Sequence, residues 1–155
     1  MKATMKTEEF TLDKEEQTID LGMSLGSSIR ESKDKSPISI FLCGNLGTGK
    51  TTLTKGILKG LGFSGLVKSP TFNLVEIYEI QDLEIYHFDL YRINSTNELD
   101  EIDIRKSLSS QNTISIIEWP ESFEDFLPSP DIRIDLSHFN LEPNSRKIRV
   151  RYLKM

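Results

Sequence analysis

The chain has little of what secreted, membrane and nucleic-acid-binding proteins usually contain. Its 155 residues include one cysteine, Cys43, so no disulfide can form within the chain, whereas secreted domains of this size usually carry paired cysteines. No apolar stretch has the length that a signal peptide or a membrane span requires. We therefore expect a cytoplasmic protein without membrane contact, and interpret Cys43 as a small hydrophobic residue that ends a buried strand.

The chain also lacks a net positive charge. The formal net charge of −5 argues against broad binding to a nucleic-acid backbone. The exception is a run of five basic residues near the C-terminus: Arg146, Lys147, Arg149, Arg151 and Lys154. Apolar residues at positions 148, 150 and 152 alternate with them, so we interpret the run as one solvated face of a terminal strand. The alternative is a docking face for an acidic partner or for RNA.

What the chain does contain is a complete phosphate-loop pattern, GxxxxGK[ST], over 44–51, directly after the apolar run 38–43. A buried strand that feeds a glycine-rich turn and then a helix aims successive backbone N–H groups and the positive helix end at one point. This arrangement suits the phosphates of a nucleotide. The glycines of the loop, which allow a close approach of the phosphates, are Gly44, Gly47 and Gly49.

The other residues of the loop have individual roles in this interpretation. Lys50 supplies a mobile positive charge for the β and γ phosphates of ATP, and the Thr51 hydroxyl is expected to bind Mg²⁺. Thr52 is expected to contact the α phosphate. Asn45 and Thr48 complete the predicted ATP-binding loop.

A magnesium-nucleotide site also needs a carboxylate at the end of a neighbouring strand. Glu118 follows an apolar run in the manner of a Walker B element, and Asp89 ends a similar run that a histidine interrupts. Both are predicted as catalytic residues, together with Lys50, and as metal ligands, together with Thr51. The alternative for either acid is a helix cap or a salt bridge.

Ser69, Pro70 and Thr71 lie in the loop that follows the phosphate-loop helix, where a segment that senses the γ phosphate is expected. Thr71 would then contact Mg²⁺. The alternative is that Pro70 stiffens a turn before the next strand.

Three further side chains are ambiguous. His87 is interpreted as packed and hydrogen-bonded, because phosphoryl transfer depends on positioning more than on a histidine base. Trp119 belongs either to the core or to a lid over the site. Arg92 is either a phosphate ligand or a member of a surface ion pair.

Periodicity and turn residues predict a P-loop NTPase-like α/β fold, a three-layer sandwich whose mixed sheet has a parallel centre and antiparallel additions. Residues 1–155 are expected to form a single domain, with disorder only within residues 1–10 and at the C-terminal end. The predicted helices cover 13–30, 50–61 and 95–108, the last with a break near 103, and the predicted strands cover 38–43, 72–80, 84–91, 113–119, 131–139 and 146–154.

The chain resembles the TsaE family, also called YjeE. The resemblance rests on GNLGTGKTT at 44–52, VKSPTF at 67–72, HFDLYR at 87–92 and IEWP at 117–120, and it extends from about residue 12 to about residue 150. The family usually has aspartate where Asn45 stands.

The resemblance implies an ATPase, weak on its own, that works with the two-protein threonylcarbamoyl transferase, TsaB and TsaD. These proteins modify adenosine 37 of tRNAs that read ANN codons, and contact with tRNA would be indirect. It also implies that Gly47–Thr52 bind the phosphates, that Thr51 and Glu118 hold Mg²⁺, that Asp89 is required for hydrolysis and that Glu15 lies near the adenine.

Other functions share the same loop. A small-molecule kinase would need an acceptor pocket and usually an arginine-bearing lid, for which the chain has no internal arginine cluster. A GTPase is disfavoured because neither DxxG nor NKxD is present. A structural adaptor would bind nucleotide without cleaving it.

Overall fold

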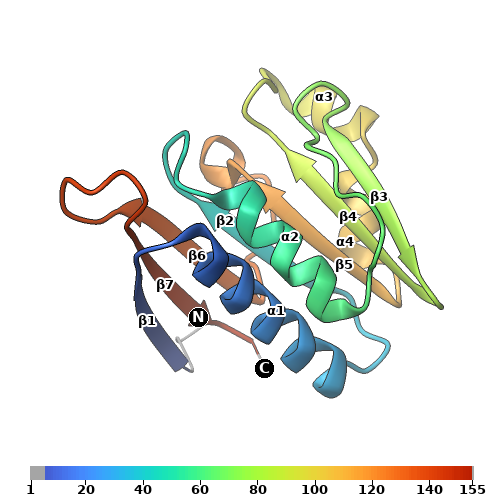
Figure 1. The fold of residues 1–155 in the computed structure, drawn as a ribbon. Coiled ribbons are helices and arrows are strands. Elements are labelled where there is room, and N and C mark those ends of the chain that lie inside the picture. The colour runs from blue at the N-terminus through green and yellow to red at the C-terminus, as the bar shows by residue number, and fades with distance from the viewer. Residues whose placement is uncertain (1–5, 155) are drawn as a thin grey trace.

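A computed structural model describes residues 6–154 and shows a sheet with helices on both faces (Figure 1). Its elements in chain order are β1 (Lys6–Leu12), α1 (Glu15–Ser32), β2 (Ile38–Cys43), α2 (Lys50–Leu61), β3 (Val75–Ile80), β4 (Leu83–Asp89), α3 (Thr96–Glu101), α4 (Ile104–Ser109), β5 (Thr113–Glu118), the 3₁₀ helix η1 (Pro120–Phe123), β6 (Ile132–His138) and β7 (Arg146–Tyr152). The seven strands lie in the order β1-β7-β6-β2-β5-β4-β3.

The centre of the sheet is parallel and its two sides are antiparallel. β2 pairs in parallel with both β5 and β6, and β4 pairs in parallel with β5. The antiparallel additions are β7 and β1 on one side and the β3–β4 hairpin on the other. The predicted mixed sheet is therefore confirmed, and the strands predicted over 72–80 and 84–91 correspond to the β3–β4 hairpin.

Two hydrophobic clusters, one on each face of the sheet, make the fold a three-layer sandwich. Ile40 packs with Leu25 of α1 and Leu53 of α2, while the next residue, Phe41, packs with Leu99 of α3. Because successive side chains of a strand point to opposite faces, a continuous apolar run such as β2 serves both clusters. Among the described residues no helix is long and apolar enough to cross a membrane.

Local sequence signals set several helix ends. Gly62 ends α2 with a φ of 107°, and its N–H donates to the carbonyl groups of Leu58 and Lys59. Ser95 caps α3 by accepting a hydrogen bond from the N–H of Glu98 at 3.4 Å. At the start of α1, the Gln17 side chain accepts hydrogen bonds from the backbone N–H groups of Asp13 and Lys14.

The expected disorder within residues 1–10 is wrong for residues 6–10. These residues belong to β1, which pairs along its whole length with β7. The pairing with β7 satisfies the backbone hydrogen-bonding groups of this segment. Its mixture of polar and apolar residues does not by itself indicate a strand. Residues 1–5 lie outside the described residues.

Glycines allow α1 and α2 to pack backbone against backbone. Gly22 and Gly26 of α1 face Gly56 and Gly60 of α2. A Cβ atom at Gly26 would lie 2.2 Å from the carbonyl oxygen of Ile57, which is far inside van der Waals contact. This close approach brings the start of α1 to the start of α2, as Figure 1 shows.

We expect Gly26→Ala to lower the free energy of unfolding by about 1–3 kcal/mol, because the added methyl group meets rigid backbone atoms and forces the helices apart. Ser28→Ala, at an exposed position of the same helix, is the control and should change it by less than about 0.5 kcal/mol. Urea denaturation measures both. Equal stability of the two variants would show that the helices do not depend on this contact.

Candidate functional site

A cavity lies at the carboxyl ends of the central parallel strands, where ligands of open α/β sheets usually bind. Its volume is about 360 Å³. The residues that line it are Glu15, Thr18, Leu46, Gly47, Gly49, Lys50, Thr51, Thr52, Thr71, Asp89, Glu118, Trp119, Asn144 and Arg146. Most of the residues that the sequence proposes for ATP binding and catalysis therefore meet here.

The loop between β2 and α2 has the backbone geometry that its glycines permit. Gly49 is the N-cap of α2 with a φ of 99°, a left-handed conformation that suits glycine. A Cβ atom at Gly44 would lie 2.4 Å from the carbonyl oxygen of Leu136. Within the loop, the hydroxyl of the buried Thr48 donates to the Asn45 carbonyl oxygen at 2.8 Å.

Lys50 is almost fully buried, with 5% of its surface exposed. Its ammonium donates to the carbonyl oxygens of Gly44 and Asn45 and lies 3.6 Å from the centre of the Trp119 ring. Burial lowers the pKa of Lys50, and the negative charge of Glu118 opposes this effect. The ammonium group therefore contacts both the backbone of the loop and an aromatic ring.

Glu118 connects three elements of the fold. Its Oε2 atom accepts a hydrogen bond from the Thr51 hydroxyl of α2 at 3.2 Å and lies 2.5 Å from Nε2 of His87 on β4. Glu118 is 3% exposed and His87 is fully buried. The prediction that His87 is packed and hydrogen-bonded is confirmed, and its partner is the carboxylate predicted as catalytic.

Asp89 lies beside Glu118, because β4 and β5 run in parallel with these two residues in register. Its Oδ1 atom accepts a hydrogen bond from the N–H of Tyr91 at 3.0 Å. Burial raises the pKa of the Asp89 carboxyl group, and the nearby charge of Glu118 adds to this effect. Two carboxylates and one ammonium therefore share the same end of the sheet.

Trp119 serves both as part of the core and as a cover over the loop. It is half-buried against the cluster on the α3 face, and it also lines the cavity above Lys50. Its φ of 59° is unusual for a bulky residue, and the ring of Tyr91 lies 4.7 Å from it. Strained backbone of this kind persists only where the surroundings hold it, often at functional sites.

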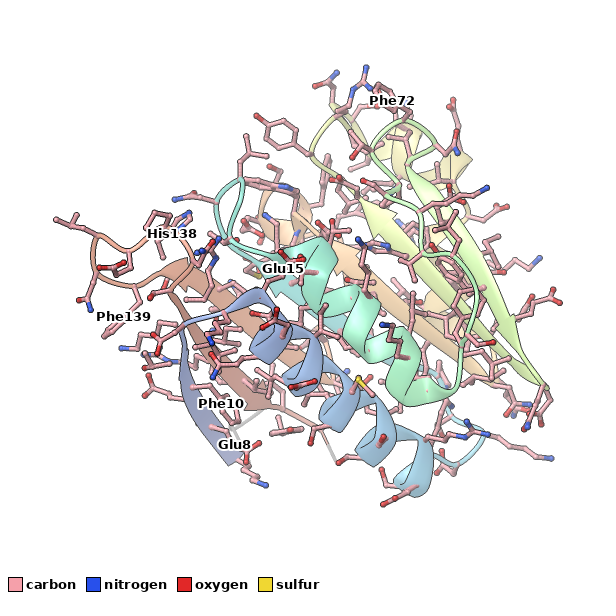
Figure 2. All side chains as sticks on the ribbon, in the orientation of Figure 1. Glu8, Phe10, Glu15, Phe72, His138 and Phe139 are labelled. Carbon is pink, nitrogen blue, oxygen red and sulfur yellow. The ribbon has the colours of Figure 1, made fainter. Side chains whose placement is uncertain are left out.

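The loop at Ser69, Pro70 and Thr71 shows features of both interpretations, a segment beside the site and a turn before the next strand. Thr71 lines the cavity and its hydroxyl lies 2.7 Å from that of Ser69. Pro70 is buried, and its carbonyl oxygen accepts from the N–H of Leu74 in a turn before β3. Next to Thr71, Phe72 projects outward from the loop and is 86% exposed (Figure 2).

Arg92 takes neither of its expected positions. It is outside the set of residues that line the cavity, and its guanidinium lies 5.6 Å from the centre of the Phe72 ring. Glu15 does line the cavity, and Figure 2 shows it at the start of α1, close to the first turn of α2. The resemblance that placed Glu15 near the nucleotide is consistent with this position.

Arg146 is the main site residue that the sequence reasoning did not select. Its guanidinium donates to the carbonyl oxygens of Gly47 and Thr48 at 3.1 and 3.0 Å and lines the cavity. The strand period contained the signal, because Arg146 has the same parity as the buried Ile148 and Val150 and the opposite parity to Lys147, Arg149 and Arg151. Arg146 therefore does not belong to the solvated face proposed for this strand.

Thr18, Leu46 and Asn144 also line the cavity and were not predicted. Thr18 lies on the first turns of α1, and Asn144 lies in the connection before β7. Leu46 occupies a variable position of the phosphate loop. Neither Thr18 nor Asn144 belongs to a recognisable motif, so only the packing of α1 and the return of β7 reveal these two. Within residues 6–154 no group of three His, Cys, Asp or Glu side chains could hold a metal ion.

The fold and the loop together define an α/β protein of the phosphate-loop class. The chain belongs to the TsaE family, because the family profile described as "Threonylcarbamoyl adenosine biosynthesis protein TsaE" matches residues 12–148. That match includes the loop, both carboxylates and Arg146.

Individual relatives agree. The chain is 46% identical over 103 residues to the tRNA threonylcarbamoyladenosine biosynthesis protein TsaE of Haemophilus influenzae, covering 66% of this chain and 65% of the relative. It is 32% identical to the protein of the same name from Rickettsia bellii, over 85% of this chain and 88% of the relative. The crystal structure of Bacillus subtilis YdiB superposes with a TM-score of 0.72 at 25% identity, covering 96% of this chain and 86% of YdiB.

We expect Arg146→Met to loosen the phosphate loop, because the variant keeps an unbranched apolar stem and loses the donors to Gly47 and Thr48. The free energy of unfolding should fall by about 1.5–3 kcal/mol, and the amide protons of the loop should exchange faster. Arg149→Met, which removes only an exposed ion pair with Glu9, is the control and should cost about 0–1 kcal/mol. Unchanged loop exchange in Arg146→Met would contradict this role.

Proposed function

We propose that this protein binds ATP with Mg²⁺ in the cavity and hydrolyses it in the service of tRNA threonylcarbamoylation. The observation that carries the proposal is the bond between Thr51, the last residue of the phosphate loop, and Glu118 at the end of the neighbouring parallel strand. This contact links the phosphate loop at the start of α2 to the acidic end of β5, the two segments that we assign to phosphate and metal binding. The curated relatives are named for biosynthesis of threonylcarbamoyladenosine in tRNA, which supports the pathway.

The phosphates of ATP would lie against the backbone from Gly47 to Thr52, at the N-terminus of α2, where the helix dipole and free N–H groups favour negative charge. Lys50 would exchange the carbonyl oxygens of Gly44 and Asn45 for phosphate oxygens. Arg146 would stabilise the loop through its carbonyl groups and leave the N–H groups of the loop available.

The residues at the loop suit Mg²⁺. A hydroxyl, Thr51, and a carboxylate, Glu118, are hard oxygen ligands, and Mg²⁺ sites of nucleotide enzymes usually combine one or two such groups with phosphate oxygens. Asp89 adds a second carboxylate at the same end of the sheet. When bound, Mg²⁺ supplies charge neutralisation at the phosphate oxygens.

Hydrolysis needs a water molecule aligned with the terminal phosphate and a group that accepts its hydrogen bond. Three carboxylate residues line the cavity. Of these, Asp89 and Glu118 end neighbouring parallel strands, and we assign them to this task and to metal binding. Trp119 covers Lys50 and limits the access of bulk water to the loop. Thr71, on the loop before β3, lines the cavity, and we assign it to the response to the terminal phosphate.

In this proposal hydrolysis resets a protein assembly and does not modify a small substrate. The partners are the two proteins of the threonylcarbamoyl transferase, TsaB and TsaD, and contact with the tRNA is indirect. The setting is the cytoplasm, where tRNA is modified. The residues that line the cavity come from α1, α2, β4, β5, the start of β7 and the loops beside these elements.

We expect Glu118→Gln to lower ATP turnover by about a hundredfold or more while ATP binding is retained, because the amide keeps the shape of the side chain and loses its charge. Turnover is measured alone and then with TsaB, TsaD and tRNA. Binding is read from the fluorescence of Trp119, the only tryptophan. Glu101→Gln, an exposed substitution on α3, is the control and should behave as wild type.

The same assay separates the alternatives. ATP labelled on its γ phosphate should release the label as free phosphate. Label transferred to a small molecule would instead identify a kinase, and binding without turnover in every mixture would identify an adaptor. Equal affinity for GTP and ATP would support a GTPase.

A further inference from the structure

His87 has a position that packing alone does not explain. On β4 it follows Ile85 on the face that packs against α2, where an apolar residue would continue the core. It is fully buried, and its Nδ1 atom has no hydrogen-bond partner among the described residues. An unsatisfied buried polar atom costs stability that leucine at this position would avoid.

The contact on the other side of the ring is short. Nε2 lies 2.5 Å from Oε2 of Glu118, while Nδ1 faces no acceptor. A buried N–H without an acceptor is more costly than a buried lone pair on an aromatic nitrogen, so the proton belongs on Nε2. The ring then donates this N–H to Oε2 of Glu118.

The two oxygen atoms of Glu118 are therefore not equivalent. Oε2 accepts from both His87 and Thr51. Oε1 has no donor among the described residues, although Glu118 lines the cavity. When hydrogen bonds fix one oxygen atom of a carboxylate, the other oxygen atom points in a fixed direction.

We propose that His87 is a positioning residue: its Nε2–H holds Oε2 of Glu118 so that Oε1 faces the cavity as a ligand for the magnesium ion of the nucleotide. The inference rests on the proposed function, since it assigns a role in that same site. Hydrogen bonds from a neighbouring residue to a metal ligand orient that ligand, and their loss typically weakens metal binding by about 10–100-fold.

Two amide substitutions separate this role from a general need for a polar group. The amide nitrogen of glutamine reaches about as far as Nε2 of histidine, while that of asparagine lies near the position of Nδ1. His87→Gln keeps a donor for Glu118, and His87→Asn removes it with the same chemical group. His138→Asn, at the exposed end of β6 (labelled in Figure 2), is the control because it is the only other histidine.

The measurement is the affinity for ATP in excess Mg²⁺ and in EDTA, read from Trp119 fluorescence of the full chain. Wild type, His138→Asn and His87→Gln should bind ATP more tightly with Mg²⁺. His87→Asn should bind it equally in EDTA and lose about tenfold or more of the gain from Mg²⁺. A full gain in His87→Asn would overturn the positioning role, whereas no binding of ATP by the wild type would refute the proposed function itself.

A second measurement needs no variant of His87 and so does not depend on its folding. In ¹⁵N-labelled wild-type protein, the imidazole nitrogen signals report which nitrogen of His87 carries the proton, and His138→Gln assigns them by removing the other histidine. A protonated Nε2 and a bare Nδ1 are expected. A proton on Nδ1 with a bare Nε2 would leave Glu118 without this donor and would contradict the proposal.

Discussion

Lys50 and Glu118 are two opposite charges buried at one end of the sheet. The surrounding structure supplies the polar and aromatic partners that replace water around them. Burial of a charge without partners is costly, so each has a set of its own. The lysine has two loop carbonyl oxygens and the Trp119 ring, and the glutamate has the Thr51 hydroxyl and His87. These contacts require β2, β4, β5 and α2 to meet in one register.

The same constraint explains how the outer elements reach the site. Direct contact between the backbones of α1 and α2 at paired glycines brings Glu15 and Thr18 to the loop. From the other direction, the antiparallel return of β7 brings Arg146 to the carbonyl groups of Gly47 and Thr48. The site is therefore closed by segments from both ends of the chain, and β1 pairs with β7 along the same side.

The sequence predicted the order of the elements well, because each depends on local chemistry. Gly62 and Ser95 mark helix ends through bonds to residues three or four positions away, and the hairpin after residue 72 needs only a short turn. Local reasoning failed at β1, whose strand conformation comes from pairing with β7 at the opposite end of the chain. It left Arg92 undecided, and only the structure shows that its guanidinium lies near the Phe72 ring.

By itself the sequence determined that a phosphate loop joins a buried strand to a helix and that acids end two later strands, since both are patterns of adjacent residues. Only the tertiary structure decided which side chains meet. His87 and Glu118 lie 31 positions apart, and Thr48 and Arg146 lie 98 apart. Contacts over such distances depend on strand order, register and the close packing of helices, which the side-chain pattern of any single segment does not specify.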